Sequence, residues 1–374
     1  MLNLAAAQLR CGHSVTVLSH CSTERWPLVE AGLAALGVGG KLRCVVLENR
    51  RFLERLFGAR SLRAIIRLRR EHDIIHVHGT WRPMLAWALS AAGKRPCMVT
   101  PHGMISNYGM EQKPVRKRLA FKLFWRRALR RAGIVQGLTS AECEELAALL
   151  PGAKLTVIPN GIDPRHYPAD VDRTEFHRLH PELEGEPYVL FLGRIDRIKG
   201  LDLLVQAFEL VAKRAPAKLV IAGPDSAYGE SIRQLAVDRD LVKRVVFVGM
   251  LSGPNKRAAL AGSACLCQPS RYESFGISVL EALASGIPVV ISDQFGFAAQ
   301  VAGAAVGRVV PLEVPEISAA ILEYLGNREL RRTTGIAARQ FALSHFSWDQ
   351  VAGAINAEYE SLIADRCAAH PAPM

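Results

Sequence analysis

Two charged segments contain residue types that could bind a phosphorylated substrate. In the first, Arg194 and Lys199 flank a predicted turn that follows an apolar run and opens a helix. Two fixed cations at this spacing can neutralise a diphosphate. The same spacing also fits a basic loop that caps the following helix, so it does not establish a site by itself.

The second segment, residues 271–288, carries Glu273 in a predicted loop and Glu281 two turns into the helix that follows. A helix start offers free N–H groups and a positive dipole end, which together hold a phosphate well. The carboxylates on either side could accept hydrogen bonds from sugar hydroxyls. By spacing alone, an ordinary strand, loop and helix with one exposed glutamate at each end is the better explanation.

Short β-branched apolar runs alternate with longer helical patterns along the chain. Several of these runs are continuously apolar, which is typical of parallel strands buried on both faces. The pattern predicts two doubly wound α/β domains. The predicted strands are residues 14–19, 44–47, 73–78, 97–100, 134–139 and 155–159 in the first half, and 188–193, 218–223, 245–249, 265–269 and 287–292 in the second.

The alternation breaks once, in a proline-rich polar stretch after residue 159. Such a stretch is typical of a domain linker. Ligands bind at the carboxyl ends of the strands in open α/β sheets, so the cleft between two such domains is the expected site. The predicted parts are an N-terminal domain (1–165), a linker (166–187), a C-terminal domain (188–338) and a pair of C-terminal helices (339–374).

The first domain opens on a predicted helix, residues 1–9, that leads directly into the strand at 14–19. A doubly wound domain normally begins with a strand and a glycine-rich turn. We therefore expect this domain to lack its first strand. An unpaired sheet edge would then be exposed.

Taken together, Gly193-Arg194, residues 199–202 (KGLD) and the pair Glu273 and Glu281 resemble the signature of glycosyltransferase family 4. Other segments extend the similarity over nearly the whole chain: residues 76–79 (HVHG), 100–104 (TPHGM), 158–163 (IPNGID) and 346–348 (FSW). The resemblance implies a retaining, nucleotide-sugar-dependent enzyme of the GT-B fold, in which two Rossmann-like domains face a central cleft. The first domain would bind the acceptor, and the second the donor.

The resemblance also implies individual roles. Arg194 and Lys199 would bind the donor diphosphate and stabilise its departure. Glu281 would bind the ribose hydroxyls, Glu273 would bind hydroxyls of the donor sugar, and His102 would help to position the reacting centre. The backbone amides that would contact the sugar and the phosphates belong to Ser274, Phe275, Gly276 and Ile277.

Members of this family work without a metal ion, so the resemblance implies no metal and no cofactor beyond a UDP- or GDP-linked sugar as substrate. Front-face attack is the favoured route to retention, although Glu273 is the nearest candidate nucleophile for a covalent route.

Asp238 and Asp240 have the spacing used by metal-dependent glycosyltransferases, but their charged run favours a solvated helix end. His76 and His78 share one face of a predicted strand, and structural or substrate-contact roles suit them better than metal ligation.

The net charge of +12 is concentrated in the first half of the chain. Residues 1–158 hold 25 Lys and Arg against 10 Asp and Glu, whereas residues 159–374 hold 22 against 25. Such asymmetry suggests a polyanionic partner or a solvated basic face. Nucleic acid is the weaker option because no recognition motif accompanies the charge.

The stretch 113–131 has nine basic residues and no acidic one, with apolar residues at helical spacing. This pattern predicts an amphipathic helix that either lies on an anionic membrane or packs an apolar stripe into the core. We expect the membrane role, because many relatives act on lipid-linked acceptors. The predicted membrane or acceptor residues are Lys113, Arg116, Lys117, Arg118, Lys122, Trp125, Arg126 and Arg127.

These observations predict a cytoplasmic hexosyltransferase, peripheral at the inner face of the plasma membrane, that acts in surface-glycan synthesis on a lipid-linked or polysaccharide acceptor. The eight cysteines form no metal or disulfide pattern, which fits a reducing compartment. Two other functions remain open: a non-catalytic protein that binds membranes or anions, and a nucleotide-sugar epimerase of the same fold. The spacing of Glu273 and Glu281 argues against the epimerase.

Overall fold

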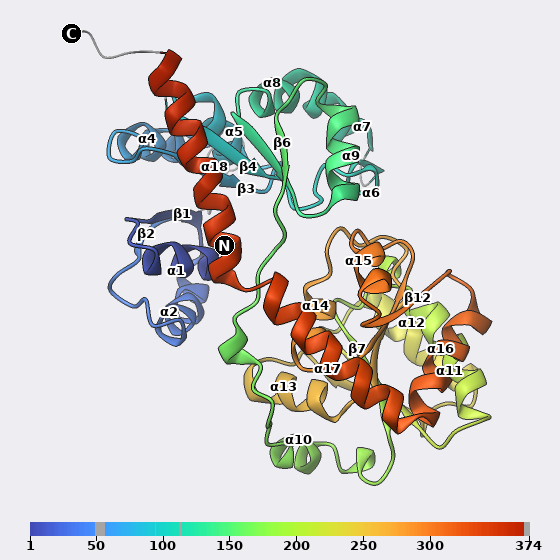
Figure 1. The fold of residues 1–374 in the computed structure, drawn as a ribbon. Coiled ribbons are helices and arrows are strands. Elements are labelled where there is room, and N and C mark those ends of the chain that lie inside the picture. The colour runs from blue at the N-terminus through green and yellow to red at the C-terminus, as the bar shows by residue number, and fades with distance from the viewer. Residues whose placement is uncertain (49–56, 94, 112–113, 370–374) are drawn as a thin grey trace. The chain divides into compact units, whose positions relative to one another are not determined.

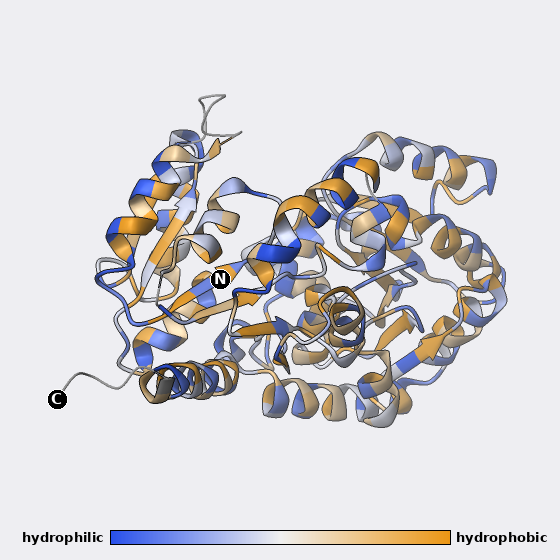
Figure 2. Cartoon of the chain, turned by 90° about the horizontal axis from the view of Figure 1, so that it is seen from above, coloured by the Kyte–Doolittle hydropathy of each residue, from blue (hydrophilic) through white to orange (hydrophobic). Residues whose placement is uncertain are grey.

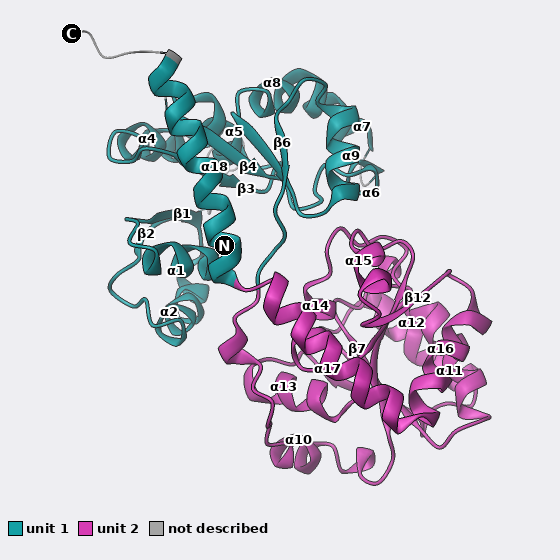
Figure 3. Cartoon of the chain, in the orientation of Figure 1, with its two compact units in different colours: residues 1–161, 348–374 teal, residues 162–347 magenta. Residues whose placement is uncertain are grey.

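The computed structural model describes residues 1–48, 57–93, 95–111 and 114–369 (Figure 1). The chain forms two compact units (Figure 3). Unit 1 comprises residues 1–161 and 348–374, and unit 2 comprises residues 162–347. Each unit is an α/β structure built on parallel strands.

Unit 1 contains two separate parallel sheets. β1 (Thr16–His20) pairs with β2 (Arg43–Leu47) in a two-stranded sheet. The other sheet has the order β3-β4-β5-β6. Its strands are β3 (Ile75–His78), β4 (Cys97–Thr100), β5 (Ile134–Gly137) and β6 (Leu155–Val157).

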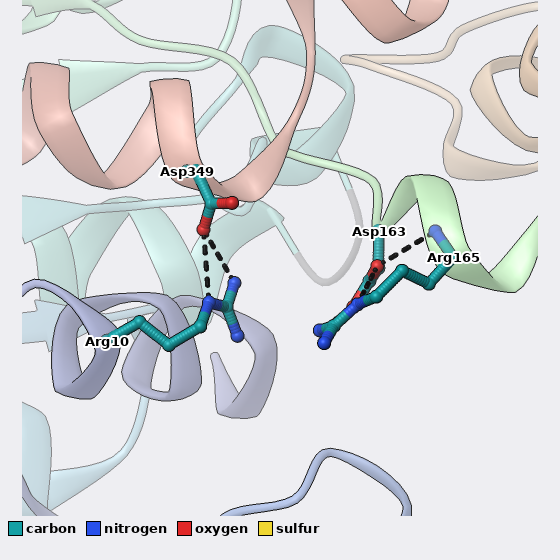
Figure 4. Close-up of polar contacts among 4 residues, drawn as sticks. All are labelled: Arg10, Asp163, Arg165 and Asp349. Carbon is teal, nitrogen blue, oxygen red and sulfur yellow. Dashed lines mark hydrogen bonds and ion pairs between the residues drawn. The ribbon is translucent and has the colours of Figure 1, made fainter.

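The helices of unit 1 include one from the far end of the chain. α18 (Trp348–Ala369) packs against α1 (Leu2–Arg10), where Arg10 donates to Asp349 over 2.7 Å (Figure 4). The same figure shows a second pair, within unit 2, in which Arg165 binds Asp163. Within the described part of unit 1, the remaining α-helices are α2 (Trp26–Ala35), α4 (Ala59–Leu68), α5 (Pro83–Ser90), α6 (Asn107–Glu111), α7 (Pro114–Ala120), α8 (Arg126–Leu129) and α9 (Ser140–Leu149).

Unit 2 contains one six-stranded parallel sheet with the order β12-β11-β10-β7-β8-β9. Alternate residues of its central strands are buried against opposite faces, so these strands are mostly apolar, with Lys218 and Gln268 as polar residues at strand ends. Figure 2 colours the chain by the hydropathy of each residue. The strands are β7 (Tyr188–Leu192), β8 (Lys218–Ala222), β9 (Val245–Gly249), β10 (Cys265–Gln268), β11 (Val289–Ser292) and β12 (Gly307–Val310).

Helices cover both faces of this sheet. α11 (Leu201–Ala212), α12 (Ala227–Asp238) and α16 (Val314–Gly326) contribute to one apolar core with the sheet. α13 (Gly253–Gly262) and α14 (Ile277–Ala284) pack on β7, β10 and β11. The remaining helices are α10 (Thr174–Leu179), α15 (Ala298–Gly303) and α17 (Arg328–His345).

The division into units differs from the predicted parts in two respects. The predicted linker 166–187 includes α10, whose Phe176 is buried, so this stretch is part of unit 2. The predicted pair of C-terminal helices is divided between the units. α17 stays with unit 2 because Gly335 packs against the Gly286 carbonyl, and α18 belongs to unit 1.

Candidate active site

The strand order of unit 2 reverses between β7 and β10, its two central strands. Chain connections leave these neighbours in opposite directions, so the loops at their carboxyl ends flank a crevice suited to a ligand. The loop after β7 is residues 193–200, and the loop after β10 is residues 269–276. Most of the predicted donor-binding residues lie in these two loops, and the other two, Ile277 and Glu281, lie in α14.

Gly200 holds these two loops together. Its φ of 68° lies in the left-handed region. A Cβ atom at this position would lie only 1.9 Å from the carbonyl oxygen of Pro269, at the start of the other loop. Glycine is therefore required for two independent reasons, the backbone conformation and the close approach.

Arg271, in the loop after β10, links that loop to the loop after β7 and to the start of α11. Arg271 donates two hydrogen bonds to Asp202, over 2.8 and 2.7 Å, and a third to the carbonyl of Arg197. Burial acts to raise the pKa of Asp202, but the bonds from Arg271 outweigh it and the pKa is lowered. Tyr228 also donates to Asp202, and burial together with that carboxylate raises the pKa of Tyr228 to about 12. Asp202 is thus a fixed anion that orients Arg271.

The predicted residues Lys199 and Glu273 are brought into direct contact as an ion pair. Their side chains are 14% and 16% exposed, so the pair sits mostly away from water. Arg194 is 71% exposed and lies 3.3 Å from Asp196. The loop therefore carries a sheltered cation, Lys199, and an exposed one, Arg194.

The start of α14 lies beside this pair. Gly276 precedes the helix with a φ of 82°, and a Cβ there would lie 2.4 Å from the ring of Phe295. The predicted donor residue Phe275 has a buried side chain in an aromatic cluster with Phe297 and Phe346. Phe275 could therefore contact a donor only through its backbone.

Glu281 accepts hydrogen bonds from two residues that were not predicted from the sequence. Lys256 donates to its Oε1 over 2.6 Å, and Tyr167 donates to the same atom over 2.7 Å. Burial and the nearby carboxylate raise the pKa of Tyr167, which therefore remains a donor. Among the described residues both donors use Oε1, so Oε2 is the oxygen that a hydroxyl could reach.

In unit 1, His102 follows β4 in the left-handed conformation, with a φ of 55°. Its Nε2 lies 3.1 Å from Nδ1 of His78. The next residue, Gly103, donates its N–H to the buried carboxylate of Glu142, which also accepts from the N–H of Leu138. Glu142 therefore fixes the turn that carries His102.

A chain of hydrogen bonds runs across the sheet behind His102. Nε2 of His76 lies 2.7 Å from the hydroxyl of Thr100, which donates to Gln136, which in turn donates to the carbonyl of Ile158. Burial, followed by the charge of His102, lowers the pKa of His76 to about 3. Burial likewise lowers the pKa of His102 to about 4. Both imidazoles are neutral at pH 7.

These lowered pKa values predict an acid-sensitive unit 1. Unfolded histidine titrates near 6.5, so below that pH the unfolded chain binds protons that the folded chain excludes, and the free energy of unfolding falls. For His76 the expected loss between pH 7.5 and 5 is about 2 kcal/mol. The five tryptophans lie in unit 1, so their fluorescence in urea reports this unit.

His76→Gln should reduce the loss of stability between these two pH values, and His13→Gln, at an exposed position, should leave it unchanged. Equal losses in the unmodified chain and in His76→Gln would contradict the prediction.

The basic stretch forms α7, a π-helical turn (Phe121–Trp125) and α8. Its exposed apolar residues are Val115, Leu119, Leu123 and Phe124. The prediction for Trp125 is wrong, because its side chain is 5% exposed and packs against Trp81 in the core. Lys117 lies over the ring of Trp81. Arg116, Arg118, Lys122, Arg126 and Arg127 are exposed, and Lys113 lies outside the described residues.

Asp238 and Asp240, which have the spacing of metal-binding carboxylates, lie outside the two loops of the candidate donor site. Asp238 ends α12 and accepts a hydrogen bond from Gln234, and Asp240 lies in the turn that follows. In the described ranges no three His, Cys, Asp or Glu side chains are grouped to hold a metal ion. Over the same ranges, no helix combines the length and apolar character needed to cross a bilayer.

Two family models match the chain, and together they span both units. The model described as "Glycosyltransferase Family 4" matches residues 1–166, and the one described as "Glycosyl transferases group 1" matches residues 172–341. Each match extends over almost the whole of one α/β region. These matches define the class of protein, an enzyme family that transfers sugars.

Relatives of known name agree with this class. The chain is 28% identical to the D-inositol 3-phosphate glycosyltransferase of Jonesia denitrificans over 77% of this chain and 72% of that protein. It is 26% identical to the phosphatidyl-myo-inositol mannosyltransferase of Mycobacterium tuberculosis over 97% and 92%. Anabaena HepE, solved in complex with UDP and glucose, has a similar fold, with a TM-score of 0.74 at 19% identity over 93% and 100% of the two chains.

The chain belongs to the family 4-like glycosyltransferases, and its two α/β units have the GT-B fold.

Proposed function

We propose that this glycosyltransferase moves a hexose from a nucleotide-diphosphate sugar to a lipid-linked or polysaccharide acceptor in surface-glycan synthesis, with retention at the anomeric carbon. The observation that supports the donor site best is the arrangement at the switch point of unit 2. There Glu273 and the start of α14 lie together with Lys199, whose loop also carries Arg194. A diphosphate needs such a group of cations and N–H donors.

In this proposal Lys199 and Arg194 bind the donor diphosphate. Lys199 is sheltered and already positioned by Glu273, so it needs little reorganisation to stabilise a developing charge. Arg194 is exposed and can move onto the phosphates once they arrive. The backbone amides of Ser274 to Ile277 supply further donors, Oε2 of Glu281 accepts from the ribose, and Glu273 accepts from the sugar hydroxyls.

The ion pair also supports front-face attack over a covalent intermediate. A carboxylate bound to Lys199 is a weaker nucleophile than a free one, because the ammonium group stabilises its charge. The bond between the anomeric carbon and the phosphate oxygen breaks, and the acceptor oxygen bonds to that carbon on the same face. The acceptor proton passes to the leaving phosphate. His102 contributes as a neutral hydrogen-bonding group that helps to position the reacting centre.

Because Arg194, Lys199 and the helix start already provide positive charge, we propose a reaction without a metal ion or another cofactor. The test is release of a nucleoside diphosphate from UDP-, GDP- and ADP-sugars, with phosphatidylinositol or undecaprenyl phosphate as acceptor and EDTA present. One donor is expected to give release that depends on acceptor. If no donor gives release, the proposed transferase function is wrong, and a non-catalytic protein or an epimerase becomes the better explanation. Conversion of a free UDP-sugar to its epimer would identify the epimerase.

The exposed surface of α7 and the π-helical turn supports peripheral binding to an anionic membrane, with the enzyme at the inner face of the plasma membrane. Leu123 and Phe124 are 70% and 54% exposed among basic side chains. Apolar insertion and charge attraction together favour such a surface.

We expect the chain to sediment with phosphatidylglycerol vesicles, and less so at 0.5 M salt. Leu123→Ser with Phe124→Ser should weaken binding about tenfold or more. Val237→Ser removes an apolar side chain of unit 2 that is about as exposed as Phe124, and it should leave binding unchanged. Equal binding by all three proteins would contradict a membrane role for this surface.

A further inference from the structure

A buried amide at the carboxyl end of β10 lacks a hydrogen-bond partner among the described residues. Gln268 is the last residue of β10, and it is fully buried. Its Nε2 has no acceptor in the part of the chain that the structure describes. A buried donor without an acceptor is costly, and such groups are rare in folded proteins. The N–H groups of Gln268 therefore need an acceptor that the described chain does not supply.

The other end of the Gln268 side chain is fixed. Ser278, in the first turn of α14, donates its hydroxyl to Oε1 of Gln268 over 2.8 Å. With Oε1 bonded, Nε2 lies on the side of Gly193, where a Cβ atom added to that glycine would be 3.8 Å from it. Gly193 is the first residue of the loop that carries Arg194 and Lys199. The amide is thus held between the start of α14 and the loop that bears the two proposed diphosphate-binding cations.

The space beside Gly193 can hold an atom of a ligand. A Cβ built at Gly193 would have its nearest heavy atom 3.7 Å away, in the ring of Phe191. At Gly200, in the same loop, a Cβ would clash with the carbonyl of Pro269, the residue after Gln268. The two loops therefore meet tightly at Gly200 and leave room at Gly193. The backbone of Gly193 has no positive φ, so its conformation does not require glycine.

The charges around this space favour an anionic oxygen as the acceptor. The loop of residues 193–200 has three basic residues and one acidic residue. The start of α14, to which Ser278 belongs, adds N–H groups and the positive end of a helix dipole. Glu273 is close by, but its charge is compensated by Lys199. A phosphate oxygen suits these surroundings better than a neutral group.

We propose that Gln268 is a further donor-binding residue, whose amide donates to an oxygen of the donor diphosphate. The inference rests on the proposed function, because that function places the diphosphate between these two loops. Ser278 holds the amide in position before the donor arrives, so little side-chain freedom is lost on binding. The diphosphate would supply the acceptor that Nε2 lacks, and Gln268 would bind it without adding charge to the site.

The first part of the test compares Gln268→Met with Gln136→Met in the full chain. Both glutamines are buried in a strand, but Gln136 is bonded at both ends, to Thr100 and to the carbonyl of Ile158. Methionine is unbranched, of similar length and apolar. Thermal unfolding followed by circular dichroism should show a melting temperature several degrees lower for Gln136→Met. Gln268→Met should unfold at an unchanged or higher temperature, because it removes an unpaired buried donor.

The second part measures nucleotide binding by titration calorimetry. The probes are UDP, GDP and ADP, and the one that stabilises the unmodified chain is used. Gln268→Met should raise its Kd about tenfold or more, the size expected for a lost hydrogen bond to a charged group. Gln234→Met changes an exposed glutamine of α12 and should leave the Kd unchanged.

Each outcome decides the inference. An equal Kd in the unmodified chain and in Gln268→Met would overturn it and leave the proposed function standing. If none of the three nucleotides binds the unmodified chain, the proposed function and this inference fail together. A melting temperature of Gln268→Met as low as that of Gln136→Met would show that the amide is already paired, for example by a fixed water, and would also overturn it.

A second variant covers the case in which Gln268→Met does not fold. Gln268→Met with Ser278→Ala removes both partners of the hydrogen bond, so no hydroxyl is left without its acceptor. The same rise in Kd is expected for this double variant, and an unchanged Kd would overturn the inference.

Discussion

Lys199→Met is expected to lower kcat/KM for sugar transfer by about 100- to 1,000-fold, because it removes the sheltered cation beside the leaving diphosphate. The change costs about 3–4 kcal/mol of transition-state stabilisation. The effect should fall mainly on kcat, since the charge on the diphosphate grows as the sugar bond breaks. Initial rates of nucleoside diphosphate release at several donor concentrations measure both constants.

Two controls separate chemistry from folding. Lys213→Met removes an exposed lysine that also forms an ion pair, with Glu209, but at the end of α11 and outside the donor site, and it should leave kcat/KM unchanged. Lys199→Met alone leaves Glu273 sheltered without its partner, which destabilises unit 2. The double variant Lys199→Met with Glu273→Gln should recover stability and remain inactive. Recovery of activity in the double variant would show that the pair is only structural.

Gly200→Ala is expected to destabilise unit 2 by at least about 3 kcal/mol and to abolish transfer. The added Cβ would meet the Pro269 carbonyl oxygen at 1.9 Å, and the backbone would have to hold a φ of 68°. Neither Gly200 nor Pro269 can shift without moving a loop of the donor site. Urea unfolding followed by circular dichroism, with kcat/KM measured on the same protein, checks both effects.

Gly303→Ala is the matched control for this change. Gly303 lies in α15, and a Cβ there would have no heavy atom within 4 Å. Alanine should be neutral or slightly stabilising at that position, because it restricts the unfolded chain. If Gly200→Ala unfolds like Gly303→Ala, the two loops are not locked together as described.

The strands of the fold were largely predictable because a buried parallel strand must be apolar on both faces. Each of the eleven predicted strands has a counterpart in the structure. β12 was not predicted, and its position explains why. It is a four-residue edge strand that, among the described strands, pairs only with β11, and it includes the polar Arg308, which binds Glu323. An edge strand of this kind carries little of the apolar signal of an interior strand.

The residues that we propose to bind the donor were predicted from sequence motifs, whereas the residues that hold them in place were not. Lys199 and Glu273 follow motifs, whereas the clamp of Arg271 on Asp202 depends on which loops the sheet brings together. Tyr167 and Glu281 are 114 residues apart, and no local pattern links them. Glu142 did have a local signal, since Thr139 and Glu142 have the spacing of a helix cap. The side chain of Glu142 extends further, to Gly103.

The basic stretch shows a limit of periodicity. Its apolar residues divide into two sets at helical spacing, one with Phe121, Trp125 and Leu129 and the other with Leu119 and Leu123. Both sets fit a helix equally well. The structure buries the first set against α5 and the sheet and exposes the second, so the error at Trp125 came from not knowing which face the core would cover.

The central claim is that unit 2 binds a nucleotide-diphosphate sugar through Lys199 and Arg194. It is tested most directly by thermal unfolding of the full chain with UDP-, GDP- and ADP-sugars. One donor at 100 times its Kd should add about 2.7 kcal/mol to the free energy of unfolding. The same donor at the same concentration should add far less to Lys199→Met with Glu273→Gln. An unchanged melting temperature across the whole panel, or equal stabilisation of that double variant, would contradict the claim.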